Sequence, residues 1–167
     1  SSEYGSFTDP RDGKTYKTVK IGNQVWMAEN LNYNIGSGSW CYDDNSSNCN
    51  KYGRLYDWEA AKKACPAGWH LPSKSEFETL LNNYGGEGSN AYNALIPSGS
   101  SGFSALFGGW RNSDGDFYVI GSYGRFWSSS PSDSNSAWHL YVSGNLKSAD
   151  VDDDNRSVGF SVRCLQD

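Results

Sequence analysis

The sequence predicts an α+β fold in which two helices pack on twisted antiparallel sheets and two disulfides hold the chain together. Three patterns support this prediction: a β-hairpin near the N-terminus, two helical segments in the middle, and short strands in the last third. The chain has 167 residues, enough for one hydrophobic core, and it shows no internal repeat. We expect a single domain over residues 9–167, preceded by an N-terminal extension over residues 1–8.

Residues 7–29 have the pattern of β structure. Asp12-Gly13 and Gly22-Asn23 are typical hairpin turns, and the residues between them alternate in polarity. The sequence therefore predicts strands at Tyr16–Ile21 and Gln24–Ala28.

Two helices are expected after a polar loop at residues 34–50. The first is predicted from Arg54 to Ala64. The second begins at Ser73, because Ser73 and Glu76 match a capping box that satisfies free backbone N–H groups in the first turn. Its apolar residues recur at helical spacing until a glycine pair ends the pattern. They are Phe77, Leu80, Leu81 and Tyr84.

The rest of the chain is expected to be irregular at residues 85–109 and then mainly β. Short runs of β-forming residues alternate with turn signals from residue 110 onward. The predicted strands are Trp110–Asn112, Asp116–Ile120, Arg125–Ser129, Ala137–Val142, Leu146–Val151 and Val158–Cys164. An acidic loop at residues 152–155 is expected to separate the last two strands.

Four cysteines allow three pairings. Cys41 and Cys49 bracket a short polar segment, which favours a loop closed at its base and leaves Cys65 to pair with Cys164. A zinc site is the alternative, but the spacing contains no C-x-x-C and neither histidine is well placed. We therefore expect disulfides and, with them, a secreted or cell-surface protein.

Composition excludes two classes of partner. The net charge is −5 and no lysine or arginine run is present, so we expect no nucleic-acid partner. No apolar run approaches the roughly 18 residues of a membrane span, so we expect no membrane insertion. The first residues have neither a basic flank nor an apolar stretch, so an export signal is expected outside this chain. We expect a monomer.

Five stretches carry a family resemblance. Residues 16–31, 52–56, 65–72, 126–129 and 159–164 resemble the ordered signatures of the Fibrobacter succinogenes major paralogous domain. The resemblance covers nearly the whole chain.

That family is similar to the C-type-lectin-like fold, which formylglycine-generating enzymes and the variable proteins of diversity-generating retroelements also use. The resemblance implies a bacterial secreted or surface domain without an established enzymatic activity. It also implies a bridge from the end of the first helix to the last strand, which fits Cys65 and Cys164. The tripeptides of calcium-dependent lectins, Glu-Pro-Asn and Trp-Asn-Asp, do not occur in this sequence.

Catalytic chemistry is not expected. Formylglycine-generating enzymes need two reactive cysteines, whereas all four cysteines here are expected in bridges. His70 is expected to be structural, packed or hydrogen-bonded beside the second helix. The acidic clusters lie in polar loops, which does not suit the carboxylate pair of a glycosidase. We therefore predict no enzyme and no required cofactor.

Calcium is the one metal that the acidic residues could hold. Asp150, Asp152 and Asp154 supply several oxygens within a short stretch, although the spacing is not that of an EF-hand loop. The alternative, a solvated acidic turn, is favoured.

The late strands and loops are the expected binding surface. Rigid aromatic residues with small polar neighbours suit recognition of sugars or proteins. His139 and Tyr141 share one strand face, and His139 belongs to this surface only if that face is exposed. The candidate ligand-binding residues are Tyr123, Trp138, His139, Tyr141, Asn145 and Lys147. We expect a non-enzymatic module that binds a polysaccharide or a surface protein; the alternative is a structural or adhesive surface protein without a small ligand.

Overall fold

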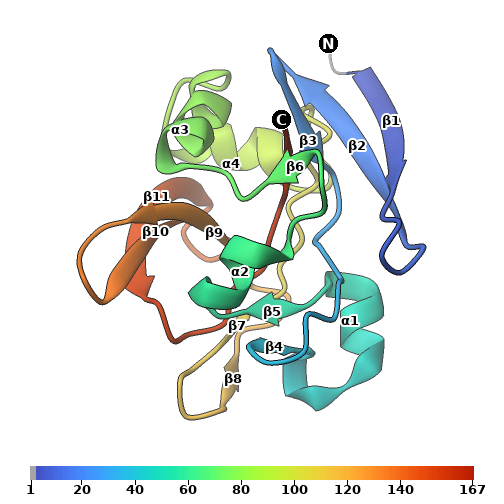
Figure 1. The fold of residues 1–167 in the computed structure, drawn as a ribbon. Coiled ribbons are helices and arrows are strands. Elements are labelled where there is room, and N and C mark those ends of the chain that lie inside the picture. The colour runs from blue at the N-terminus through green and yellow to red at the C-terminus, as the bar shows by residue number, and fades with distance from the viewer. Residues whose placement is uncertain (1–2) are drawn as a thin grey trace.

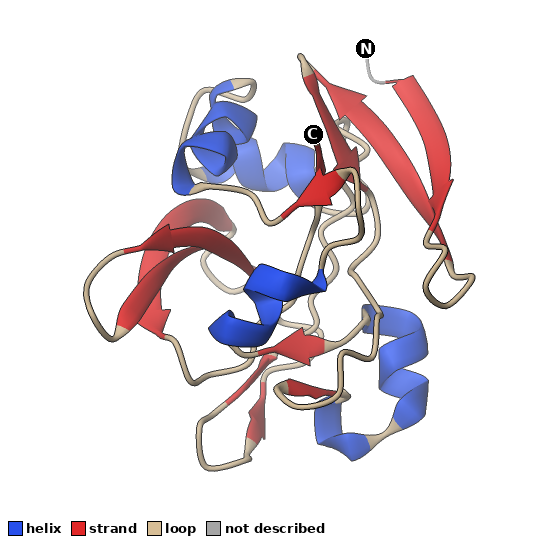
Figure 2. Cartoon of the chain, viewed as in Figure 1, coloured by secondary structure: helices blue, strands red, loops and turns tan. Residues whose placement is uncertain are grey.

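The computed structural model describes residues 3–167. These residues form helices and antiparallel sheets around two hydrophobic clusters, so the predicted α+β class is confirmed (Figure 1). Long loops join the elements, as Figure 2 shows. The helices in this range are α1 (Ser46–Tyr52), α2 (Trp58–Ala64), α3 (Lys74–Asn82) and α4 (Ser89–Leu95), with a short 3-10 turn at Tyr42–Asp44.

The largest sheet joins the two ends of the chain. Its order is β1–β2–β3–β12–β6, so the C-terminal strand lies between β3 and β6. Leu165 pairs with both Trp26 and His70. The strands are β1 (Glu3–Thr8), β2 (Thr15–Ile21), β3 (Gln24–Met27), β6 (Trp69–His70) and β12 (Leu165–Gln166).

The N-terminal hairpin is confirmed and begins earlier than expected. Residues 3–8, which the sequence assigned to an extension, form β1 because their backbone pairs with β2 from Glu3↔Lys20 to Thr8↔Thr15. Residues 1 and 2 of the predicted extension lie outside the described residues.

The second sheet has the order β11–β10–β9 and comes from the last third of the chain. Its strands are β9 (Tyr123–Pro131), β10 (Ser136–Ser143) and β11 (Ser148–Asn155). The predicted acidic loop at 152–155 is wrong, because β11 stays paired with β10 as far as Ser136↔Asn155. Two small two-stranded sheets complete the fold: β4 (Ser39–Trp40) with β5 (Leu55–Tyr56), and β7 (Trp110–Arg111) with β8 (Phe117–Tyr118).

The two predicted helices are present, one of them shorter than expected. α3 has the predicted capping box at Ser73 and Glu76. α2 begins at Trp58 rather than Arg54, because the preceding residues pair as β5 and the Asp57 side chain caps the helix by accepting from the N–H of Ala60. The sequence did not predict α1 or α4, which are short and lie in segments that were expected to be loops.

The segment before β12 runs through the centre of the molecule without forming a regular strand. It was predicted as a strand, but its backbone bonds to several elements in turn. Phe160 and Tyr56 exchange backbone hydrogen bonds, and the carbonyls of Ser161, Val162 and Cys164 accept from Trp127, Leu31 and Met27 respectively. Residues 158–165 are all buried. Through these backbone bonds they connect the two hydrophobic clusters to both sheets.

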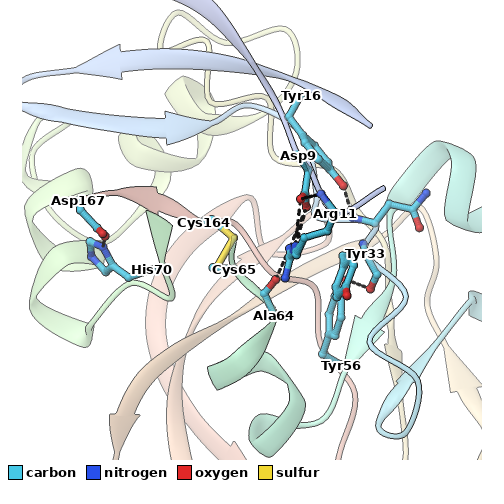
Figure 3. The surroundings of a disulfide bond; sticks show 11 residues. Asp9, Arg11, Tyr16, Tyr33, Tyr56, Ala64, Cys65, His70, Cys164 and Asp167 are labelled. Carbon is cyan, nitrogen blue, oxygen red and sulfur yellow. Dashed lines mark hydrogen bonds and ion pairs between the residues drawn. A yellow bond between two sulfur atoms is a disulfide. The ribbon is translucent and has the colours of Figure 1, made fainter. Parts of the chain in front are cut away.

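Both predicted disulfides are present, and no described cysteine is free. Cys41–Cys49 joins the 3-10 turn to α1. Cys65–Cys164 joins the end of α2 to the segment before β12 (Figure 3). Beside it, Arg11 forms an ion pair with the buried Asp9 and donates to the carbonyl of Ala64, so the hairpin turn is tied to the same point.

Within residues 3–167, no helix combines the length and apolar character needed to cross a lipid bilayer.

Candidate functional site

One face of the second sheet gathers most of the predicted site residues. Side chains alternate along a strand, so cross-strand partners share a face. Tyr141 pairs with Arg125 on β9 and with Asp150 on β11. We call this surface the aromatic–acidic face; it comprises Tyr123, Arg125, Tyr141, Asp150, Asp152 and Asp154.

The opposite face of the sheet is packed against helices. Phe126, Leu140 and Val142 are fully buried in the cluster that includes residues of α3 and α4. Trp138 lies on this opposite face, half-buried, with the Lys74 ammonium 4.2 Å from a ring centroid. Trp138 therefore cannot share a surface with Tyr141, and grouping these two residues in one site was wrong.

Two tyrosines and an asparagine meet at one end of the aromatic–acidic face. The rings of Tyr123 and Tyr141 are 5.5 Å apart in an edge-to-face arrangement, and both are half-buried. Asn145 Nδ2 donates to the Tyr123 hydroxyl at 3.0 Å. The structure thus brings together three of the predicted residues. Lys147 lies exposed in the same turn between β10 and β11, at a positive φ of 51°.

Arg125 stands at the centre of this face, and the sequence did not identify it as a site residue. Its guanidinium carbon is 4.2 Å from the Tyr141 ring centroid, and Nη1 is 3.6 Å from Asp154 Oδ2. Only 16% of the side chain is exposed, and Nε has no hydrogen-bond partner among the described residues. The available sequence signal was its place two residues after Tyr123, which puts both side chains on one face of a strand.

His139 is on the predicted strand face, but it is fully buried, so the condition for including it in the binding surface is not met. The segment at Phe160 covers this part of the sheet: the His139 and Phe160 rings are 4.5 Å apart. Burial and the charge of Arg125 lower the pKa of His139 to about 3, so the ring is neutral and Nε2 accepts from Arg125 at 3.3 Å. His139 is therefore a buried hydrogen-bond partner of Arg125 and not a surface residue.

The three aspartates are spread along β11 and are not gathered around one point. They alternate along β11 on one face, where successive same-face residues are about 6.8 Å apart. Calcium needs six to eight oxygens within about 2.6 Å of one point. Among the described residues, no group of three His, Cys, Asp or Glu side chains could hold a metal ion. Asp150 is half-buried, and its pKa is raised by burial and by the charges of Glu87 and Asp152.

His70 has the structural role that the sequence predicted. Its Nδ1 lies 2.7 Å from an Asp167 carboxylate oxygen, and its Nε2 lies 3.0 Å from Glu76 in the capping box of α3 (Figure 3 shows the first contact). These contacts tie β6, α3 and the last residue together.

Residues 19–166 match the Fibrobacter succinogenes major domain. No curated protein and no solved structure matches. The matched range includes β3, all four helices and the second sheet, and thus most of the fold described above. The chain belongs to the Fibrobacter succinogenes major domain family.

Proposed function

We propose that this protein is a non-enzymatic, extracellular or cell-surface binding module that recognises a neutral polysaccharide through the aromatic–acidic face. The observation that carries the proposal is the grouping of Tyr123, Arg125 and Tyr141 on the side of the sheet opposite α3 and α4, beyond the part of that side that α2 and Phe160 cover. The proposal includes similarity to the C-type-lectin-like fold, in which late strands and loops serve recognition.

Sugar chemistry suits this face. The half-exposed tyrosine rings offer apolar surface and hydroxyl groups, while carboxylates and the Asn145 amide bond sugar hydroxyls. An extended strand surface also matches an extended polymer better than a small enclosed ligand.

Charge favours a neutral ligand. Asp150, Asp152 and Asp154 line one strand of the face, and Arg125 is the single cation among its six members. A uronate or sulfate group would be repelled by these carboxylates, whereas a neutral hydroxyl would accept or donate hydrogen bonds.

The two disulfides support a location outside the cytoplasm, because such bonds persist mainly in oxidising compartments.

A glycan array, followed by pull-down on cellulose and xylan, tests the proposal. We expect retention on a neutral polysaccharide that is abolished by Tyr141→Ala. Tyr4→Ala is the matched control, since Tyr4 is 71% exposed on β1, in the other sheet, and its removal should leave retention on a neutral polysaccharide unchanged. Capture of a surface protein without retention on any polysaccharide would favour the structural or adhesive alternative.

A further inference from the structure

A polar groove lies away from the aromatic–acidic face, between the N-terminal hairpin, α1 and the loop after α4. It consists of two hollows of about 260 and 460 Å³. Glu29, Lys51 and Leu106 line both hollows, so the two adjoin. We call it the lysine groove, because Lys14, Lys17 and Lys51 line it.

The groove is positive within an acidic chain. Glu29 is the one acidic residue among the described lining residues, and its carboxylate already accepts from the backbone N–H of Lys17 at 2.6 Å. Lys14 is paired with Asp12 at 3.2 Å. In residues 3–167, the ammonium groups of Lys17 and Lys51 have no carboxylate within ion-pair distance. Two exposed cations therefore face the groove without an ion-pair partner among the described residues.

The remaining lining is rich in hydrogen-bonding groups. The amides of Asn32 and Asn50 lie at the first hollow, where Asn50 is exposed. The larger apolar or aromatic side chains of the described lining are those of Tyr4, Tyr16, Pro97 and Leu106. Hydroxyl groups of a sugar would bond to the amides, and the exposed Tyr4 ring offers apolar surface to a sugar ring.

The walls of the groove are fixed in place. The Cys41–Cys49 disulfide holds α1, whose residues Cys49, Asn50 and Lys51 form one wall. At the end of α1, Gly53 has a φ of 73°, and a Cβ there would lie 2.7 Å from the carbonyl oxygen of Leu31. Only glycine permits this close approach. A ligand would therefore meet a site that needs little ordering on binding.

We propose that the lysine groove binds a uronate-bearing oligosaccharide. Carboxylates of successive sugar residues would pair with Lys17 and Lys51, and their hydroxyls would bond to the asparagine amides. The site lies on other elements than the aromatic–acidic face and has the opposite charge, so neither proposal depends on the other.

Calorimetric titration with tetragalacturonate at low ionic strength tests this inference, with cellotetraose as the neutral control. We expect tetragalacturonate to bind to the groove, and any binding of cellotetraose to be unchanged in the Lys17→Gln/Lys51→Gln variant. The double variant Lys17→Gln/Lys51→Gln should weaken uronate binding by about tenfold, and added salt should weaken binding to the unaltered protein. Lys63→Gln, an exposed lysine on α2, is the matched control and should leave the affinity unchanged.

Because Lys17 and Lys51 are exposed, the double variant should melt at the temperature of the unaltered protein, which separates loss of binding from loss of folding. The proposal is overturned if tetragalacturonate does not bind at millimolar concentration, or if the double variant and Lys63→Gln bind equally well. Preferential binding of a glutamate-rich peptide would also overturn it, in favour of a peptide site.

Discussion

The Nε of Arg163 donates to Oδ1 of Asn30 at 2.7 Å, and both side chains are buried. Asn30 Nδ2 in turn donates to the carbonyl of Tyr52 at 2.8 Å, at the end of α1. The other guanidinium nitrogens donate to the carbonyls of Met27, Phe103 and Ser104. The pair therefore joins the C-terminal segment, the end of β3, α1 and the loop after α4.

Arg163→Met should strongly destabilise the protein. The substitution leaves the Asn30 oxygen and several buried carbonyls without donors, at a cost of roughly 3–5 kcal/mol in the free energy of unfolding. Arg54→Met is the control, since the Arg54 side chain is half-buried near the surface and should cost under about 1 kcal/mol. Denaturant unfolding measures the stability of both variants. Equal unfolding midpoints for Arg163→Met and Arg54→Met would show that the Arg163 network contributes nothing.

Removing the long-range disulfide should cost more than removing the local one. Cys65 and Cys164 are 99 residues apart, whereas Cys41 and Cys49 are 8 apart, and a longer closed loop restricts the unfolded chain more. We expect Cys65→Ala/Cys164→Ala to lower the free energy of unfolding by roughly 2–5 kcal/mol. Cys41→Ser/Cys49→Ser should cost less. Melting curves of the two double variants test this order. A larger loss of stability in Cys41→Ser/Cys49→Ser would contradict it.

His70 should stabilise the fold in mildly acidic solution. Burial lowers its pKa, but the hydrogen bonds that the ring donates to the carboxylates of Asp167 and Glu76 outweigh this, and the folded-state pKa is raised above 6.5. The stabilisation is therefore complete below pH 6.5 and is lost as pH rises through the folded-state pKa. Because the side chain is 37% exposed, the effect should stay below about 1 kcal/mol. The free energy of unfolding, measured at pH 6 and pH 8, should include this stabilisation in the unaltered protein and lack it in His70→Gln. If the difference between the two pH values were the same in both proteins, the result would argue against the ion pairs.

His139 should act in the opposite direction. Burial and the charge of Arg125 lower its pKa to about 3 in the folded state, so protonation favours the unfolded chain. Stability should be complete above pH 6.5 and fall progressively as pH decreases towards 3. His139→Gln should reduce this acid sensitivity. The slope of the free energy of unfolding against pH measures the effect, with His70→Gln as the comparison. Identical slopes in His139→Gln and the unaltered protein would refute it.

Local sequence patterns predicted the hairpin, α3 and most of the late strands, because turn residues, a capping box and alternation act over short distances. The short helices α1 and α4 carry too little helical periodicity to be recognised. The face of His139 followed correctly from alternation, but its burial depends on Phe160, which is distant in sequence. Arg163 lies in a segment that was predicted as a strand. No local sequence pattern shows that its guanidinium is hydrogen-bonded only to buried carbonyls and an amide.

A nuclear magnetic resonance titration with the neutral oligosaccharide selected by the glycan array tests the central claim most directly. The account predicts that the largest amide shift changes fall on β9, β10 and β11 around Tyr123, Arg125 and Tyr141, and that Tyr141→Ala weakens binding by at least about tenfold. Shift changes concentrated elsewhere, together with unaltered affinity of Tyr141→Ala, would contradict it.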